Sequence, residues 1–157
     1  MNKIKYLVMD VDGTLTNGKI YMGNNGEMMK AFNIKDGCGI HDIAIPSGIN
    51  PVIITGRTSD ILLNRCKELS IREIYQGISN KVKKLMDITD ELSEVAYIGD
   101  DINDLSCMLP IKKAGGIVGC PADAAVEVLE ISDFISTKNG GDGAVREFIE
   151  WICKNVL

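Results

Sequence analysis

Short, continuous apolar runs alternate with longer amphipathic runs along most of the chain. The apolar runs lack the polar alternation of a half-exposed strand, so they indicate strands that are buried on both faces. We predict strands at Ile4–Met9, Pro51–Thr55, Glu73–Tyr75, Glu94–Ile98, Gly116–Gly119 and Asp133–Ile135. The amphipathic runs predict helices at Gly37–Ser47, Ser59–Leu69, Asn80–Leu92, Ile102–Leu109, Ala122–Glu130 and Gly143–Asn155. This alternation predicts an α/β fold, a Rossmann-like doubly wound parallel sheet with right-handed crossovers.

Residues 18–33 interrupt the alternation with two short extended pieces around Asn24-Asn25-Gly26. An Asn-Gly pair between such pieces favours a tight turn, so we predict a β-hairpin that projects after the first strand. The apolar side chains of the hairpin form either a surface for self-association or a small core of the hairpin itself. These side chains are Ile20, Tyr21, Met22, Met28 and Met29.

The composition restricts the classes of protein to which the chain can belong. Its 157 residues, 45% hydrophobic and 25% charged, suit one globular domain that covers residues 1–157. A net charge of −5 argues against a nucleic-acid partner. Five cysteines without a metal-binding spacing argue against structural zinc and fit reduced thiols in a cytoplasmic protein. The first apolar run is cut by aspartates, so we predict neither a signal peptide nor a membrane span.

Aspartates gather where two of the predicted strands end. Asp10 and Asp12 follow the first strand, and Asp100, Asp101 and Asp104 follow the strand at Glu94–Ile98. The carboxyl ends of parallel strands share one edge of a sheet, so the two groups should meet and repel each other. Carboxylate oxygens suit Mg²⁺, which would offset that repulsion. For a single aspartate the simpler alternative is helix capping, which we expect for Asp101 or Asp104.

Two further residues point to an anionic ligand at the same edge. Thr55 ends the strand in "VIITGR", where a hydroxyl and backbone N–H groups can hold phosphate oxygens. Its alternative role is to cap the next helix, which Thr58 or Ser59 could do equally well. Lys81 lies in the first turn of a helix that we expect Ser79 to cap, where a cation opposes the helix dipole unless an anion binds nearby. The alternative for Lys81 is a solvated helix face.

Taken in order, these stretches resemble the four motifs of the haloacid dehalogenase superfamily of phosphohydrolases. They are "DVDGT" at 10–14, Thr55 in "IITGR", Lys81 in "SNK" and "GDDIND" at 99–104. The chain from Thr14 to Thr55 leaves no room for a cap domain. The chain is similar over residues 4–152 to the small capless subgroup that includes 3-deoxy-D-manno-octulosonate 8-phosphate phosphatases, through "FNIKDG", "RCKEL", "YQGISNK" and "GGDGAVREF".

The resemblance implies a Mg²⁺-dependent phosphatase that forms an aspartyl phosphate. Asp10 is then the nucleophile and a metal ligand, while Asp12 is the general acid and base and a metal ligand through its carbonyl. Asp100 and Asp104 complete the metal site or support it, and Thr55 and Lys81 hold the phosphoryl group. The residues implied to line the sugar-acid site are Asp12, Asn33, Ile34, Lys35, Asp36, Gly37, His41, Gly56, Arg57, Arg65, Lys81 and Arg146.

The resemblance also implies a homotetramer held by the hairpins, in which neighbouring subunits complete each site. The substrate that the resemblance implies is a sugar-acid phosphate, either octulosonate 8-phosphate for lipopolysaccharide or a nine-carbon acid 9-phosphate. Lys35 and His41 stand where relatives often have arginine, Asn17 replaces a frequent aspartate, and the chain ends at Leu157, with little tail to close over a neighbouring site. These departures leave the chemistry intact and affect the substrate assignment.

Several assignments keep an alternative at this point. Arg57 and Arg65 could belong to a solvated helix face, and the glycines at 140, 141 and 143 could form a simple turn. A signalling receiver domain also holds Mg²⁺ among strand-end acids, but its acceptor aspartate should lie on a later strand than its acid pair. A non-catalytic module that only assembles a partner is the remaining alternative.

Overall fold

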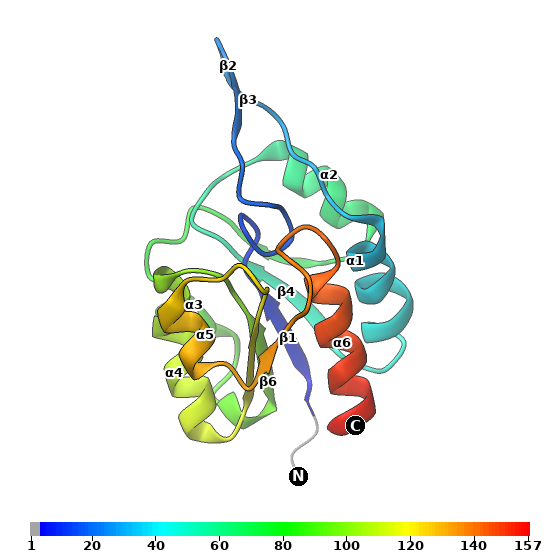
Figure 1. The fold of residues 1–157 in the computed structure, drawn as a ribbon, viewed down its shortest axis with the longest axis vertical. Helices are drawn as coiled ribbons and strands as arrows, with labels where there is room; N and C mark the ends of the chain where they lie inside the picture. The colour runs from blue at the N-terminus through cyan, green and yellow to red at the C-terminus, as the bar shows by residue number, and fades with distance from the viewer. Residues whose placement is uncertain (1–3) are drawn as a thin grey trace.

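The computed structural model describes residues 4–157, in which a six-stranded parallel sheet carries helices on both faces (Figure 1). The strand order is β5-β4-β1-β6-β7-β8, so the first strand is central and later strands are added on either side of it. The predicted fold class is therefore confirmed. The strands of this sheet are β1 (Tyr6–Met9), β4 (Asn50–Ile54), β5 (Glu73–Tyr75), β6 (Val95–Ile98), β7 (Ile117–Cys120) and β8 (Phe134–Ile135).

The helices form two layers that bury different sets of strand side chains. Along β1, Leu7 and Met9 pack into the layer of α1, α2 and α6, while Val8 packs into the layer of α3, α4 and α5. These helices are α1 (Ile34–Cys38), α2 (Asp60–Glu68), α3 (Lys81–Ile88), α4 (Leu105–Ala114), α5 (Val126–Ile131) and α6 (Ala144–Asn155). Because both faces are covered, the strands are almost continuously apolar.

Shorter helical segments complete the described chain. A π-helix, η1 (Gly39–Ala44), continues α1, and single 3₁₀ turns, η2 (Leu92–Glu94) and η3 (Ile102–Asp104), flank β6. Between β1 and β4 the described chain holds only the hairpin and the α1–η1 segment, which agrees with the predicted lack of a cap domain. Among residues 4–157, none of the helices combines the length and apolar character that crossing a membrane requires.

Several helix boundaries differ from those predicted. The first helix begins at Ile34 rather than Gly37, because the side chain of Asn33 accepts a hydrogen bond from the Lys35 backbone at 2.8 Å and caps it. Helix α4 continues through Pro110 to Ala114, five residues beyond the predicted end. The burial of Met108 and Ile111 outweighs the one hydrogen bond that Pro110 cannot make.

Two other predicted helices are shorter than expected. Helix α3 ends at Ile88 rather than Leu92, and its N-cap is Asn80 rather than Ser79. The Asn80 side chain accepts a hydrogen bond from the Lys83 backbone at 3.1 Å, so the capping position lies one residue later than predicted. Helix α5 begins at Val126, four residues later than predicted, because residues 121–125 form a turn.

The predicted hairpin consists of β2 (Tyr21–Gly23) and β3 (Gly26–Met29), which pair with each other and project from the body of the molecule (Figure 1). Met22 and Met28 are 61% and 68% exposed, and Ile20 and Met29 are also exposed. In this chain the apolar side chains therefore do not form a core of the hairpin, except that Tyr21 is half-buried. A cluster of this kind is typical of a contact surface.

Candidate active site

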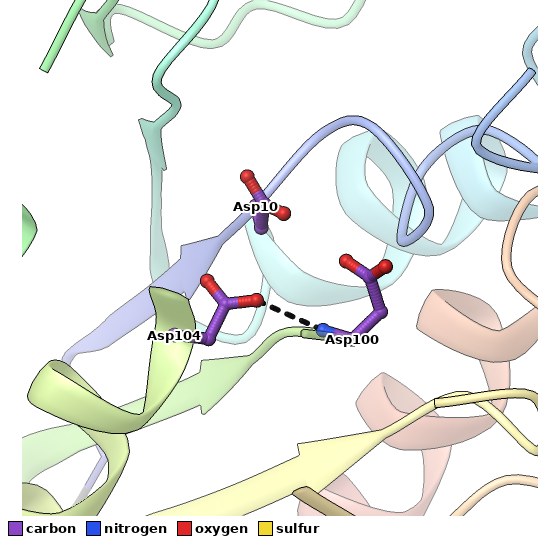
Figure 2. Close-up of side chains that lie close together, drawn as sticks. All are labelled: Asp10, Asp100 and Asp104. Carbon is purple, nitrogen blue, oxygen red and sulfur yellow. Dashed lines mark hydrogen bonds between the residues drawn. The ribbon is translucent and has the colours of Figure 1, made fainter. Parts of the chain in front are cut away.

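Asp10 directly follows β1, and Asp100 follows the adjacent strand β6 by two residues, so both side chains lie at the carboxyl edge of the sheet. Figure 2 shows them together with Asp104, which lies at the end of the 3₁₀ turn η3. One carboxylate oxygen from each of these aspartates lies within 4.8 Å of the other two. The structure thus brings together the two acid groups that the sequence places far apart.

Burial and repulsion make Asp10 and Asp100 resist ionisation. Burial, followed by the negative charge of Asp104, raises the pKa of Asp10 to about 6, although Lys81 opposes this rise. Burial, followed by the charge of Asp10, raises the pKa of Asp100 to about 8. A bound cation would relieve the same repulsion at neutral pH.

The loop after β1 is shaped to hold Asp100 close. Gly13 has a φ of 89°, and a Cβ added there would lie 2.0 Å from a carboxylate oxygen of Asp100. The Thr14 hydroxyl donates a hydrogen bond to the other oxygen of Asp100 at 3.0 Å. Gly140 packs so tightly on this loop that an added Cβ would lie 1.9 Å from the Gly13 carbonyl oxygen. The glycine-rich segment at 140–143 therefore supports the loop that carries the aspartates.

Lys81 joins the two acid groups from the first residue of α3. Its Nζ lies 2.9 Å from Asp10 Oδ1 and 2.9 Å from Asp104 Oδ1, and its side chain is only 3% exposed. Burial disfavours the ammonium, but the charges of Asp10 and Asp104 outweigh it and raise the pKa of Lys81. The alternative of a solvated lysine is therefore excluded, and a positive charge is fixed beside the candidate nucleophile.

Asp104 is completely buried and already surrounded by donors. Its Oδ1 accepts hydrogen bonds from Lys81 and from the Tyr97 hydroxyl, at 2.9 and 2.7 Å. Its Oδ2 accepts from the backbone N–H groups of Asp100 and Asp101, at 3.0 and 3.2 Å. This arrangement fixes Asp100 and Lys81 relative to each other. Asp101 caps the following turn through its side chain, as expected for one of these two residues.

Thr55 and Gly56 line the same cleft as the aspartates. The cleft has a volume of about 140 Å³, and its walls are Asp10, Asp12, Thr55, Gly56, Arg57, Asp100, Asp101 and Asn103. Thr55 is almost fully buried at the end of β4. It does not cap the following helix, because Ser59 is the N-cap of α2. The Thr55 side chain is thus available to a ligand in the cleft.

Asp12 is held by a residue that the sequence reasoning missed. Lys30, just after β3, places its Nζ 2.6 Å from Asp12 Oδ1 and 3.1 Å from Glu27 Oε2. Arg57 lies 3.2 Å from Glu27 and 3.9 Å from Asp12 Oδ2. A lysine in a hairpin is normally expected to be solvated, and the sequence offers one signal against this, the opposite charges of Glu27 and Lys30 on either side of Met28 and Met29.

The residues predicted to line the sugar-acid site do not meet in one place. Asp12, Gly56 and Arg57 line the cleft, and Lys81 contacts Asp10 beside it, but most of the others lie in two separate surface hollows. One hollow, on α1 and α2, includes Ile34, Gly37, His41 and Arg65. The second, beside the start of α6, includes Asn33, Lys35 and Arg146. Within a single chain, only part of the predicted recognition surface faces the acids.

Asp36 occupies a position that differs from its predicted role. It is 1% exposed, and its Oδ1 accepts a hydrogen bond from the Arg146 backbone N–H at 2.9 Å. It thereby accepts from the first turn of α6, where the N-cap Gly143 offers no side chain. Burial raises the pKa of Asp36. Without a rearrangement, Asp36 cannot contact a substrate, and it instead ties α1 to α6.

The donor atoms present suit a hard divalent cation such as Mg²⁺. Three carboxylates converge, and burial together with the repulsion between these groups raises the pKa values of Asp10 and Asp100. Oxygen ligands with open positions are the preferred environment of Mg²⁺. The carboxylates of Asp10 and Asp100 are best placed to hold it, since the oxygens of Asp104 are already engaged.

A central parallel strand that is followed by Asp-x-Asp, with Thr55 after β4, Lys81 at the start of α3 and Asp100 after β6, defines a phosphohydrolase of the haloacid dehalogenase superfamily. No family model matches the chain. It is, however, 43% identical over 148 residues to the 3-deoxy-D-manno-octulosonate 8-phosphate phosphatase KdsC of Escherichia coli. This alignment covers 92% of this chain and 76% of the relative. The chain belongs to the family of these KdsC phosphatases.

Solved structures agree with this assignment. A 3-deoxy-D-manno-octulosonate 8-phosphate phosphatase from Moraxella catarrhalis, in complex with magnesium, phosphate and KDO, is 41% identical, with a TM-score of 0.88, over 96% of this chain and 86% of that one. The cobalt-bound form of the deoxy-D-mannose-octulosonate 8-phosphate phosphatase YrbI from Haemophilus influenzae is 33% identical, with a TM-score of 0.89, over 97% of this chain and 88% of that one.

Proposed function

We propose that the protein is a Mg²⁺-dependent phosphatase that hydrolyses 3-deoxy-D-manno-octulosonate 8-phosphate through an aspartyl phosphate on Asp10. The observation that carries the proposal is the meeting of Asp10, Asp100 and Lys81 at one edge of the sheet. Phosphoryl transfer depends mainly on positioning and charge, and this cluster provides both. The relatives named for the same activity, and the KDO, phosphate and magnesium in one of them, support the substrate and the cofactor.

The residues of this chain can carry out both halves of the reaction. Asp10 attacks the phosphorus in line, the bond from phosphorus to the sugar oxygen breaks, and Asp12 gives its proton to the departing alkoxide. A water molecule then attacks the phosphorus of the aspartyl phosphate and loses a proton to Asp12, which releases phosphate and restores Asp10. Lys81 and Thr55 stabilise the phosphoryl oxygens throughout. When bound, Mg²⁺ supplies positive charge that offsets the repulsion between phosphate and carboxylates.

Recognition of the sugar acid is proposed to involve more than one subunit. The hollow on α1 and α2 and the hollow beside α6 lie outside the cleft, so a second chain must bring such a surface to the substrate. The exposed methionines of the hairpin are the proposed contact that holds a homotetramer together. Arg57 of the same chain, and Arg65 of a neighbour, could hold the sugar carboxylate through charge-assisted hydrogen bonds.

Composition supports a cytoplasmic setting for this activity. All five cysteines are free, as expected for reduced thiols. There, release of octulosonate from its phosphate would supply the sugar acid for lipopolysaccharide biosynthesis.

A steady-state screen tests the substrate assignment. Octulosonate 8-phosphate, a nine-carbon sugar-acid 9-phosphate and simple sugar phosphates are compared at saturating Mg²⁺, with EDTA as the control. We expect the largest kcat/KM for octulosonate 8-phosphate and no turnover in EDTA. A preference for the nine-carbon acid would instead indicate that Lys35 and His41, which differ from the arginines of many relatives, select that substrate. Equal rates on all substrates would reduce the proposal to a general phosphatase, and no turnover would indicate a non-catalytic module.

A further inference from the structure

Lys30 is an unusual residue in an otherwise exposed hairpin. Its neighbours Met28 and Met29 are exposed, yet the Lys30 side chain is only 4% exposed. Lysine is seldom buried to this extent unless its charge is paired. Here the ammonium contacts Asp12 Oδ1 at 2.6 Å and Glu27 Oε2 at 3.1 Å. Where the chain leaves the hairpin, the positive charge of Lys30 is therefore directed at Asp12, the candidate general acid and base.

Glu27 in turn connects Lys30 to the body of the molecule. Its Oε1 accepts a hydrogen bond from the Ser59 hydroxyl at 2.7 Å, and its Oε2 accepts from Arg57 at 3.2 Å. Burial opposes the charge on Glu27, but these bonds and that of Lys30 lower its pKa overall. Since Ser59 also caps α2, the base of the hairpin is attached to the helix that begins beside the cleft. Lys30 is thereby fixed from two sides.

The contacts of Asp12 leave one of its oxygens free for chemistry. Oδ1 is occupied by Lys30, whereas Arg57 Nε lies 3.9 Å from Oδ2, which is beyond hydrogen-bond distance. Asp12 lines the cleft and is partly exposed there. General acid and base catalysis requires the carboxyl oxygen to lie within hydrogen-bond reach of the reacting oxygen. An arrangement that holds one oxygen and presents the other meets this requirement.

We propose that Lys30 is a positioning residue for Asp12, and that Glu27 positions Lys30. The base of the hairpin is then part of the active site of its own chain, in addition to any role of its tip in assembly. The inference rests on the proposed function, because it concerns the aspartate that serves both halves of the phosphatase reaction. Within residues 4–157, the ion pairs of Lys30 join it to Asp12 and Glu27, so it acts on the cleft through Asp12.

Lys30→Met tests this role, because methionine keeps the apolar stem and removes the ammonium. With p-nitrophenyl phosphate the leaving group needs no proton, so Asp10 can form the aspartyl phosphate without Asp12, whereas hydrolysis of that intermediate needs Asp12 to accept a proton. We expect a rapid release of about one p-nitrophenolate per active site, followed by turnover roughly 10- to 50-fold slower than in the parent. Acid quenching should then trap the phosphorylated protein.

Matched variants separate positioning from loss of structure. Lys19→Met removes an exposed lysine of the same segment and should keep the parental rate. Glu27→Gln should show the same accumulation of phosphorylated protein as Lys30→Met, to a smaller extent. Should Lys30→Met fail to fold, as judged by circular dichroism, Glu27→Gln decides the question. Turnover of both variants equal to that of Lys19→Met, or loss of the rapid phase together with turnover, would overturn the inference.

The two proposals fail in different ways. If the parental protein shows no Mg²⁺-dependent turnover, or if Asp10→Asn retains it, the proposed function is wrong. If the parent turns over and Asp10→Asn does not, while Lys30→Met and Glu27→Gln match the parent, the positioning role alone is wrong.

Discussion

The acid cluster and the predicted sugar-acid surface differ in how much of each a single chain assembles. At the carboxyl edge of the sheet, Asp10, Asp100 and Lys81 lie within hydrogen-bonding distances of one another or of a shared partner. The predicted recognition residues are instead divided between the cleft and two surface hollows. One chain therefore assembles the acid cluster, whereas the residues predicted to select the substrate are spread over separate parts of its surface.

The difference follows from the kinds of structure that carry the two regions. Strand ends in a parallel sheet must meet at one edge, so topology alone brings together residues that are 90 positions apart, such as Asp10 and Asp100. Recognition residues on α1, α2 and α6 lie on helix surfaces, and nothing in the fold directs them to a common point. In the function proposed above, a neighbouring chain provides that direction.

The most damaging change to the acid cluster should be Asp10→Asn. The amide keeps the shape of the side chain but cannot act as the nucleophile, so we expect at least a roughly 1,000-fold loss of kcat with a folded protein. Steady-state assays and circular dichroism measure the two effects. Asp87→Asn, which alters an exposed aspartate on α3, serves as the control and should leave kcat unchanged. Parental activity in Asp10→Asn would refute its assignment.

Lys81→Met should be the next most severe change, and it should affect both activity and stability. Removal of one charged donor to the transition state typically costs about 100- to 1,000-fold in kcat. The two buried carboxylates of Asp10 and Asp104 would also lose their cation, so the free energy of unfolding should fall by roughly 3 kcal/mol. Lys83→Met alters an exposed lysine of the same helix turn and should change neither quantity. Activity and urea denaturation together decide the outcome.

Asp100→Asn should change the stability of the metal-free protein in the opposite direction, so that the free energy of unfolding rises. Because the folded pKa of Asp100, about 8, lies above its unfolded value, the folded state binds more protons between about pH 4 and 8, and stability falls as pH rises through this range. At pH 8.5 in EDTA, the free energy of unfolding of the variant should therefore be higher than that of the parent. The difference should shrink at pH 4.5.

Addition of Mg²⁺ completes this test. The parent should gain thermal stability from the cation, because binding favours the folded state, whereas Asp100→Asn should gain much less. Turnover should be lost in the variant despite its greater stability in EDTA. Equal responses of the two proteins to Mg²⁺ would mean that Asp100 does not hold the metal.

The same contrast explains what could be predicted from the sequence. The buried strands and the meeting of their acids were predictable, because continuous apolar runs and strand-end aspartates are local signals that topology converts into proximity. The burial of Lys30 was not, since it depends on how the hairpin returns to the sheet. Asp36 was read as a substrate contact because its motif is shared with relatives, whereas its burial against α6 depends on tertiary packing. The helix end predicted at Leu109 is wrong, because local propensity ignores the burial of Met108 and Ile111 on either side of Pro110.

The smallest expected effect concerns the hairpin, and it tests whether recognition is distributed between chains. Met28→Lys places a charge on its most exposed methionine, so it should weaken association without altering the acid cluster. We expect dissociation in sedimentation, with a KM for the sugar-acid phosphate raised by about 3- to 10-fold. The KM for p-nitrophenyl phosphate, which lacks the sugar carboxylate, should stay the same. Met86→Lys, an exposed methionine on α3, is the control. If Met28→Lys dissociates the protein and leaves both KM values unchanged, one chain recognises its substrate alone, because the neighbour's hollows then contribute no measurable binding energy.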